Sequence, residues 1–204
     1  MAPRDDEDRG GALRGGGHAP APPQDPVVVD LPADVPVLDL SSGPRADVGP
    51  WWIGRYDEDR RGGYPQAIFG GVRTLHVGLD LGAPAGTPVH AFADGVVEHA
   101  GVNPASGDYG GVVVTRHALP EGVRWVLWGH LAHADARRWR PGDVVRRGEV
   151  LARLGTPEEN GGWPPHLHLQ LAVERPDTHD MPGVVDPAER EAALRRWPDP
   201  VDLL

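Results

Sequence analysis

The segment GGWPPHLHLQL, residues 161–171, alternates histidine and leucine behind a pair of prolines. In a β-strand, successive side chains point to opposite faces, so its three leucines would pack on one side. His166, His168 and Gln170 would lie on the other side. Two imidazoles on one face, with Cα atoms roughly 7 Å apart, can serve one centre. The segment therefore predicts a strand that backs a site with leucines and presents histidines to it.

The alternation occurs a second time in TLHVGLDL, residues 74–81. A strand here would place His76, Gly78 and Asp80 on one face and the leucines and valine on the other. Gly78 would leave room for a third body between the imidazole and the carboxylate. A histidine satisfied within a core is the usual explanation of either segment alone. Two such strands, each with polar ligands on one face, favour a metal site.

The candidate ligands narrow the choice of metal. The chain contains no cysteine, so a metal must be held by imidazole and carboxylate groups. Two imidazoles and one carboxylate suit zinc (Zn²⁺), and three protein ligands leave a fourth position open for water, as in catalytic sites. The candidates His76, Asp80, His166 and His168 are one more than such a site needs. One of them would act as an acid or base, and the pattern leaves open which.

A further histidine lies in WVLWGHL, residues 125–131. In a strand, His130 would share a face with Trp128, opposite the two leucines, and the glycine between them would keep the approach clear. A lone histidine on a strand is more often an ordinary polar residue. Beside a zinc site, His130 is a candidate second catalytic histidine.

Short β-type runs, separated by glycine, proline, asparagine and aspartate, fill the chain from Thr74 to about residue 173. This spacing, in a chain with 28 glycines and 23 prolines, is typical of an all-β fold. The length of 204 residues suits one well-cored domain with extensions. We expect a disordered tail (1–25), lead-in strands with an aromatic and charged loop (26–69), a β domain (70–176) and a C-terminal extension (177–204).

The C-terminal extension contains DPAEREAALRRW, residues 186–197. It predicts one short helix, with Asp186 as the N-cap and Pro187 at the first helical position.

The overall charge and the N-terminal sequence limit the partners and the location. A formal net charge of −10 argues against binding to duplex nucleic acid, which needs a basic surface. The chain has no apolar run of about 18 residues, so no membrane-spanning segment is expected. The first 26 residues lack the apolar core of a secretory signal. The sequence as given is thus expected to be cytoplasmic, and it does not indicate an oligomeric state.

Three motifs in order resemble one family: HxxxD at 76–80, WGHL at 128–131 and HLH at 166–168. Together with the connecting segments they are similar to the lysostaphin-type (LytM-like, glycyl-glycine endopeptidase) zinc metallopeptidases. The resemblance covers about residues 70 to 175. It implies a compact antiparallel β-sheet or sandwich of the duplicated hybrid motif type, and makes the β domain a zinc metallopeptidase-like domain.

The resemblance also implies roles for the site residues. It makes His76, Asp80 and His168 the zinc ligands and leaves His130 and His166 as a catalytic pair. The expected function is then hydrolysis of a peptide or small amide bond by a zinc-activated water. The family commonly has tyrosine where this chain has Trp128, which would keep an aromatic wall but lose a hydroxyl.

A second interpretation rests on the amino-acid sequences of two segments, NGGWPPHLHLQ and GRYDEDRRGGYP. They look similar to a peptidase-like module found within cytoplasmic multidomain proteins, between aminotransferase-like and kinase-like modules. The alternative function is therefore a cytoplasmic zinc enzyme that acts on a biosynthetic small molecule by non-peptidase chemistry. A non-catalytic binding module is a third possibility, although degenerate relatives usually lose ligands and this chain keeps all five site residues.

The loop at residues 51–67 is rich in aromatic and charged residues and suits a loop that covers the site. A surface loop held by salt bridges is an equally good explanation. The substrate, whether a peptide or a small molecule, is expected to contact residues of this loop and two further tryptophans: Arg55, Asp57, Glu58, Arg60, Tyr64, Trp128 and Trp163.

Overall fold

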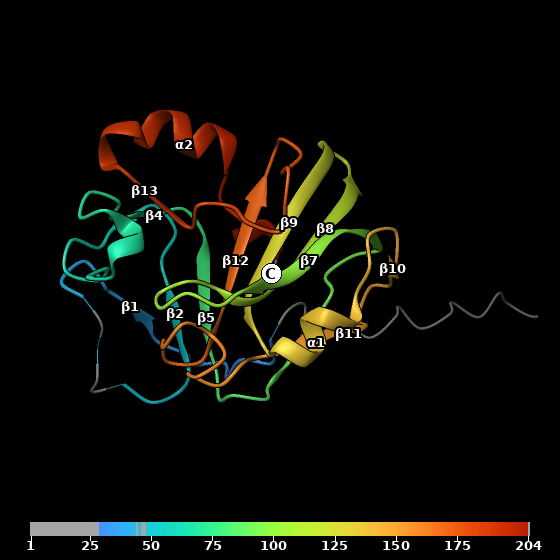
Figure 1. Ribbon diagram of the computed structural model, residues 1–204, viewed down its shortest axis with the longest axis horizontal. Helices are drawn as coiled ribbons and strands as arrows, with labels where there is room; N and C mark the ends of the chain where they lie inside the picture. The colour runs from blue at the N-terminus through green and yellow to red at the C-terminus, as the bar shows by residue number, and fades with distance from the viewer. Residues whose placement is uncertain (1–28, 44, 46–47, 204) are drawn as a thin grey trace, which may run out of the picture.

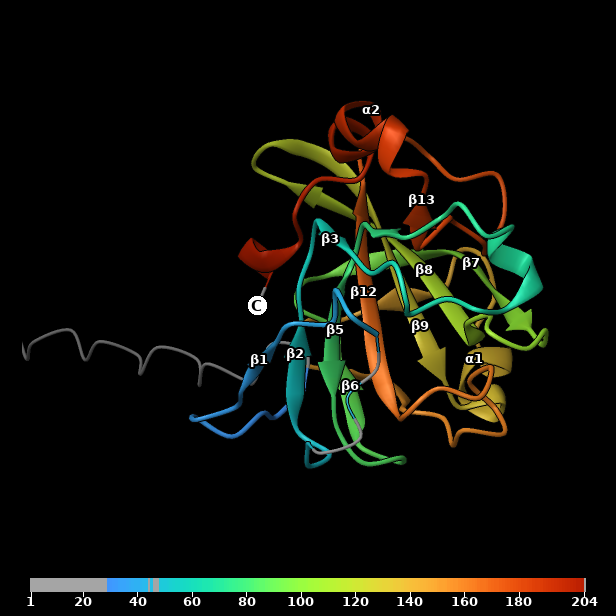
Figure 2. The ribbon, with the colours of Figure 1, turned by 90° about the vertical axis from the view of Figure 1, so that its left-hand side faces the viewer.

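The computed structural model describes residues 29–43, 45 and 48–203, so the tail expected at residues 1–25 lies outside the described residues. The main feature is an eight-stranded sheet, antiparallel except for its first pair (Figures 1 and 2). Its strands are, in spatial order, β1 (Val37–Leu38), β2 (Trp52–Gly54), β5 (Leu79–Gly82), β12 (His166–Ala172), β9 (Gly122–Leu131), β8 (Gly110–Leu119), β7 (Gly95–Asn103) and β10 (Val144–Val145). The all-β, antiparallel class predicted from the sequence is confirmed.

Two smaller sheets and several short helices complete the fold. The smaller sheets pair β6 (Pro88–His90) with β11 (Val150–Arg153), and β4 (Leu75–His76) with both β3 (Glu58–Asp59) and β13 (Val184–Val185). The helices are η1 (Ala67–Phe69), α1 (His133–Arg138), η2 (Pro187–Glu189), α2 (Arg190–Arg196) and η3 (Val201–Leu203). Figure 1 shows α2 at one end of the sheet and α1 toward the other. No helix within the described ranges is long and apolar enough to cross a membrane.

The expected C-terminal helix is present, with one local difference. The Asp186 side chain accepts a hydrogen bond from the backbone N–H of Ala188, and Pro187 follows it as predicted. The first turn is 3₁₀ and passes into α2 only at Arg190. The helix α1 is not predicted by the sequence patterns.

Strand β12 has the predicted alternation. Its three leucines belong to the first hydrophobic cluster, which also receives apolar side chains from β6, β11 and α1. Its polar face carries His166, His168 and Gln170, all of them buried. This face lies on the side of the second cluster, built around Tyr109, Leu127 and α2. The central strand thus separates one core from the polar site.

The segment at residues 74–81 is not the single strand that its alternation predicts. It divides into β4 and β5, which belong to different sheets. Leu75 and Val77 therefore pack in the second cluster, whereas Leu79 and Leu81 pack in the first. The chain bends at Gly78, where an added Cβ would overlap the ring of His168. The third body that Gly78 accommodates is this imidazole.

A bulge in β9 contradicts the prediction that Trp128 and His130 share a face. In the β8–β9 pair, Gly111 lies opposite Leu131 but Val113 lies opposite Trp128, so β9 contains one extra residue. His130 takes up the irregularity with a φ of 62°, in the left-handed region. Its side chain consequently turns to the polar face, while Trp128 stays in the first cluster.

Candidate active site

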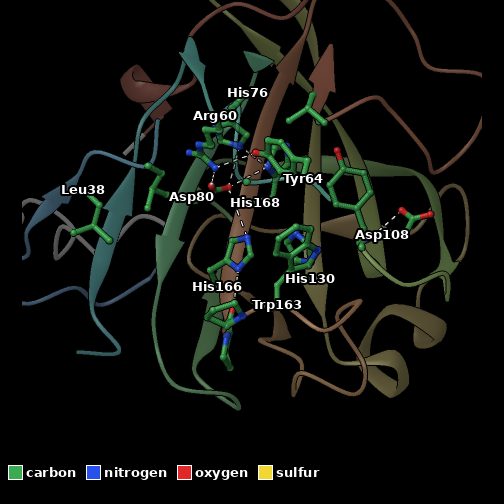
Figure 3. A pocket seen from close by; sticks show the side chains of 18 of the residues that line it. Leu38, Arg60, Tyr64, His76, Asp80, Asp108, His130, Trp163, His166 and His168 are labelled. Atoms are coloured by element: carbon green, nitrogen blue, oxygen red, sulfur yellow. Dashed lines mark hydrogen bonds and ion pairs between the residues drawn. The ribbon is translucent and has the colours of Figure 1, made fainter. Parts of the chain in front are cut away.

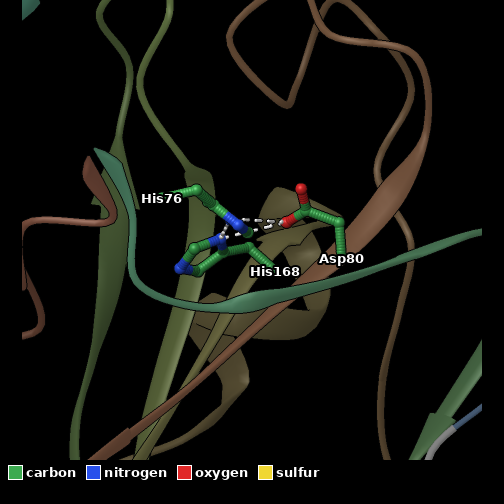
Figure 4. A group of neighbouring side chains, drawn as sticks. All are labelled: His76, Asp80 and His168. Atoms are coloured by element: carbon green, nitrogen blue, oxygen red, sulfur yellow. Dashed lines mark hydrogen bonds and ion pairs between the residues drawn. The ribbon is translucent and has the colours of Figure 1, made fainter. Parts of the chain in front are cut away.

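Three side chains from three strands converge on one point (Figure 4). Nε2 of His76 on β4 lies 3.0 Å from Nδ1 of His168 on β12, and each lies 3.1 Å from Oδ1 of Asp80 on β5. Zinc with tetrahedral ligands at about 2.0–2.1 Å would separate those ligand atoms by about 3.3 Å. All three side chains are buried. The donor set and its spacing fit zinc, the cofactor that the sequence predicts.

The atoms of these ligands that point away from the centre also have partners. Nδ1 of His76 donates to the backbone O of Arg55 at 2.8 Å, and Nε2 of His168 donates to Oε1 of Gln170 at 3.0 Å. Oδ2 of Asp80 accepts from Nη1 of Arg60 at 2.7 Å. Such outer hydrogen bonds fix the tautomer and the orientation of metal ligands. Each of the three ligand atoms is therefore presented to the centre in one orientation.

Glycines allow an aromatic ring to pack against this centre. Gly129 lies opposite His168 in the β9–β12 pair, and a Cβ there would approach Cδ1 of Tyr109 within 2.7 Å. The Tyr109 ring lies 5.2 Å from the His168 ring, and its hydroxyl donates to the backbone O of Met181. Tyr109 therefore confines His168 on the side where the glycine has no side chain.

The two histidines expected to act in catalysis lie side by side. The rings of His130 and His166 have centroids 4.2 Å apart. Nδ1 of His130 donates to the backbone O of Asn160 at 3.1 Å, and Nδ1 of His166 donates to that of Pro164 at 2.7 Å. Both rings are thus held in the tautomer that leaves Nε2 unprotonated. Nε2 of His166 lies 3.8 Å from Oδ1 of Asp80, next to the ligand atoms.

Burial disfavours the charged form of three imidazoles of the site. Desolvation and the charge of Arg60 lower the pKa of His76 to about 4. Desolvation also lowers the pKa of His166, and it lowers that of His130 well below its usual range. Burial alone would raise the pKa of Asp80, but the interactions with His76, which is charged only at acidic pH, and with Arg60 outweigh it and hold that pKa well below the usual value. Burial thus favours the neutral form of His76, His130 and His166, while Asp80 stays a carboxylate.

These residues open onto a pocket of about 570 Å³ (Figure 3). Such a volume suits a ligand of several tens of atoms. Aromatic side chains form part of its wall: the Tyr64 ring lies 4.8 Å from that of Phe69 and 5.9 Å from that of Trp163. The lead-in segment supplies another part through Leu38, Leu40 and Trp52, and the carboxylates of Asp108 and Asp180 also line the pocket.

Three of the four charged loop residues predicted to contact the substrate do not line this pocket. The side chains of Arg55, Asp57 and Glu58 do not line it. Arg55 is exposed and contributes its backbone oxygen to His76, while Asp57 is ion-paired with Arg190 near the start of α2. Glu58 is buried against Arg60, because the two-residue strand β3 turns it inward. The structure therefore does not bring these three side chains to the pocket, and their expected contact with substrate stays a prediction.

The other predicted contacts have different outcomes. Tyr64 and Trp163 line the pocket, and Arg60 lines it while holding Asp80. Trp128 does not: it is fully buried, and its Nε1–H donates to Oγ1 of Thr115 at 2.7 Å. The bulge in β9 is the physical reason, because it sends Trp128 and His130 to opposite faces.

Two residues at the site are not assigned a role by the sequence patterns. Gln170 shares its strand face with His168, so the alternation places it near the centre without indicating its hydrogen bond. Tyr109 lies in SGDYGG, where nothing in the local sequence marks it. Its position depends on the register between β8 and β9, which only the assembled sheet defines.

Comparison with curated proteins gives relatives that are peptidases by name. The chain is 40% identical over 99 residues to DD-carboxypeptidase/endopeptidase Mpg of Neisseria meningitidis, covering 48% of this chain and 20% of that protein. It is 32% identical over 111 residues to peptidoglycan DD-endopeptidase ShyC of Vibrio cholerae, covering 52% of this chain and 23% of that protein. The chain thus matches about a fifth of the length of these relatives.

A solved structure and a family model complete the comparison. The catalytic domain of lysostaphin from Staphylococcus simulans aligns with a TM-score of 0.44 and 24% identity, over 68% of this chain and 90% of that domain. The model of peptidase family M23 matches residues 74–180, more than half of the chain, and this range includes all three candidate ligands and both catalytic candidates. The chain therefore belongs to peptidase family M23.

Proposed function

We propose that this chain is a zinc-dependent hydrolase that cleaves an amide bond in a peptide of the bacterial cell wall. The observation that carries the proposal is the pairing of His130 and His166 beside a three-ligand centre. Both imidazoles are locked in the tautomer that can accept a proton, and both line the pocket. A binding module would not need two such bases.

The two histidines of the site have distinct roles in the proposed reaction. When bound, zinc would polarise the scissile carbonyl and lower the pKa of water. One of the two histidines accepts a proton through Nε2 from the attacking water. The protonated imidazole then donates that proton to the nitrogen of the leaving amine, while Nε2 of the second imidazole, also unprotonated, accepts a hydrogen bond from the attacking water and orients it.

Three observations support a peptide substrate. The relatives reported above are named a DD-carboxypeptidase/endopeptidase and a peptidoglycan DD-endopeptidase. The aromatic wall at Tyr64 and Trp163 can pack against a peptide backbone. The charged groups of the loop at residues 51–67 expected to anchor a small amino-acid-like molecule are instead engaged within the protein, at Asp57, Glu58 and Arg60.

The alternative interpretation, a cytoplasmic zinc enzyme on a biosynthetic small molecule, stays a prediction. It rests on the sequence similarity of two segments, and none of the relatives reported above is named as a biosynthetic enzyme. The cytoplasmic location is likewise a prediction from the sequence as given.

The test is product analysis by mass spectrometry. The zinc-loaded protein is incubated with purified peptidoglycan, defined muropeptides and short glycine-rich peptides, alongside His130→Ala and a control, His90→Ala, whose residue does not line the pocket. We expect new amine and carboxylate termini with the wild type and the control, and a loss of about 10²–10⁴ in kcat/KM with His130→Ala. The absence of cleavage by a fully zinc-loaded wild-type protein would contradict the proposal.

A further inference from the structure

A buried row of charges connects the lead-in segment to the metal centre. Nε of Arg60 donates to Oε2 of Glu58 at 2.8 Å, and Nη1 donates to Oδ2 of Asp80 at 2.7 Å. The exposed fractions of these side chains are 8% for Arg60, 7% for Glu58 and 4% for Asp80. Figure 3 shows the guanidinium of Arg60 beside Asp80, away from His130 and Trp163. Glu58 and Arg60 precede the range that matches the family model.

We propose that Glu58 and Arg60 are positioning residues of the metal centre: Arg60 sets how Asp80 and His76 face the metal, and Glu58 balances its charge. The proposal rests on the zinc site of the proposed function, but it concerns how that site is built and not what it cleaves. It replaces the expectation that these two side chains bind substrate.

The contact with Asp80 determines which carboxylate oxygen can be a ligand. Oδ1 faces Nε2 of His76 and Nδ1 of His168, each at 3.1 Å, whereas Oδ2 is engaged by Arg60. A charge-assisted hydrogen bond of this length is among the strong ones. The carboxylate is thereby restricted to ligation through one oxygen. A second oxygen on the metal would occupy the position that a catalytic site keeps open.

Arg60 also contacts the partner of a second ligand. Its Nη2 donates to the backbone O of Arg55 at 3.2 Å, and the same oxygen accepts from Nδ1 of His76 at 2.8 Å. One guanidinium therefore sets the surroundings of two of the three ligands. Gly54 makes the approach possible, since a Cβ there would lie 2.9 Å from Nη2 and 3.0 Å from Oδ2 of Asp80.

Glu58 explains how a buried cation can stay next to a cation site. A guanidinium that contacts a metal ligand, without an acid beside it, would repel the metal and would be costly to bury. Oε2 of Glu58 accepts from Arg60, and Oε1 accepts from the backbone N–H of Leu40 at 3.0 Å. The three charged side chains then sum to a net negative charge, which favours binding of a divalent metal. Both oxygens of Glu58 are engaged within the protein.

The neighbouring residues provide a matched control. Nε of Arg61 donates to Oδ2 of Asp59 at 2.8 Å, the same spacing along the chain as Glu58 and Arg60. The exposed fraction of the Arg61 side chain is 84%. Alternation in β3 turns one acid–arginine pair inward and the other to solvent. Arg61→Met therefore removes the same chemical group without touching the metal centre.

The experiment compares Arg60→Met, Arg60→Lys, Glu58→Gln and Arg61→Met in the full chain. Zinc affinity is measured by competition with a chelator, and ligand geometry by the visible absorption of the cobalt-substituted proteins. Circular dichroism and thermal unfolding of the metal-free forms report folding separately. Loss of outer hydrogen bonds typically weakens metal binding by about 10–100-fold. We expect losses of this size for Arg60→Met and Glu58→Gln, a smaller loss for Arg60→Lys, and none for Arg61→Met.

The cobalt spectrum distinguishes positioning from general stability. If Asp80 can turn and ligate through both oxygens in Arg60→Met, the coordination number rises and the visible bands weaken, whereas Arg61→Met retains the wild-type spectrum. Wild-type zinc affinity and spectrum in a folded Arg60→Met protein would overturn the proposal. If Arg60→Met fails to fold, unchanged affinity in Arg60→Lys and Glu58→Gln would overturn it equally. None of these readouts uses a substrate, so failure of the proposed peptidase activity would be detected separately.

Discussion

Nε2 of His168 donates a hydrogen bond to Oε1 of Gln170, two residues further along the same strand. The amide of Gln170 is itself fixed, because its Nε2 donates to the backbone O of Pro182 at 3.2 Å. The alternation of β12 thus presents a ligand and the group that orients it from one strand face. Gln170 is completely buried, so no water can replace it without a change in packing.

Replacing Gln170 with leucine should weaken zinc binding by about 10–100-fold, because the Nε2–H of His168 loses its acceptor. Gln170→Glu keeps that acceptor and should retain more of the affinity. Chelator competition on both variants checks the expectation. Equal affinities for the wild type and Gln170→Leu would show that the bond does not orient His168.

Alanine at any of the three ligand positions should remove stoichiometric zinc. His76, Asp80 and His168 each supply one ligand atom, and a site with three protein ligands tolerates little truncation. Metal content is measured after gel filtration, with His130→Ala expected to keep one zinc per chain. Full zinc content in all three alanine variants would contradict the ligand assignment.

Gly78→Ala should damage the metal site more than the fold. The new Cβ would overlap Cε1 and Nε2 of His168, forcing the ring away from the other ligands. Overpacking of this kind typically costs about 1–3 kcal/mol of stability. The control is Gly49→Ala, because a Cβ at Gly49 meets no atom within 4 Å. Zinc affinity and urea unfolding are measured for both, and wild-type affinity in Gly78→Ala would refute the assigned role of this glycine.

Substitution of Trp128 should affect stability, whereas substitution of Trp163 should affect substrate binding. Trp128→Phe loses a buried hydrogen bond to Thr115 and should lower the free energy of unfolding by about 1–3 kcal/mol, with KM unchanged. Trp163→Ala removes part of the pocket wall and should raise KM with little effect on unfolding. Urea titration and steady-state kinetics check the pair. A raised KM in a folded Trp128→Phe protein would show that Trp128 does contribute to substrate binding.

The free energy of unfolding should depend on pH through His117. Burial lowers the pKa of this ring from its ordinary value of 6.5, so the unfolded chain binds the proton more readily than the folded one. The contribution of the neutral His117 to the free energy of unfolding is therefore fully present above about pH 6.5. It is lost as the pH falls toward the pKa of His117 in the folded protein. In the metal-free protein, His117→Gln should reduce this slope. Thr115→Val, which removes the hydroxyl bonded to both His117 and Trp128 but leaves the buried imidazole, should lower stability and keep the slope.

The sequence predicts the polar face of β12 because alternation in a central strand is a local property. Leucines on one face and histidines on the other require only that the segment be extended. The same argument fails at residues 74–81. There the chain changes sheets at Gly78, and the change depends on where the His168 ring lies in the assembled structure.

The remaining errors also arise from contacts between distant segments. The bulge that separates Trp128 from His130 is defined by the register against β8 and is invisible in the β9 sequence. The inward turn of Glu58 and Arg60 depends on Asp80, twenty or more residues away. A charged loop near a pocket is compatible with binding substrate or with supporting the site, and only the positions of its partners distinguish these roles.

The left-handed backbone at His130 has an implication for engineering. A non-glycine residue held in this region costs of order 1–3 kcal/mol, and here the buried imidazole offsets part of this cost through its hydrogen bond to the backbone O of Asn160. Glycine at this position would relieve the strain and lose the reaction. Because that change would also remove a buried ring and its hydrogen bond, the relief of strain would be outweighed, and a search for heat-resistant variants should not recover His130→Gly.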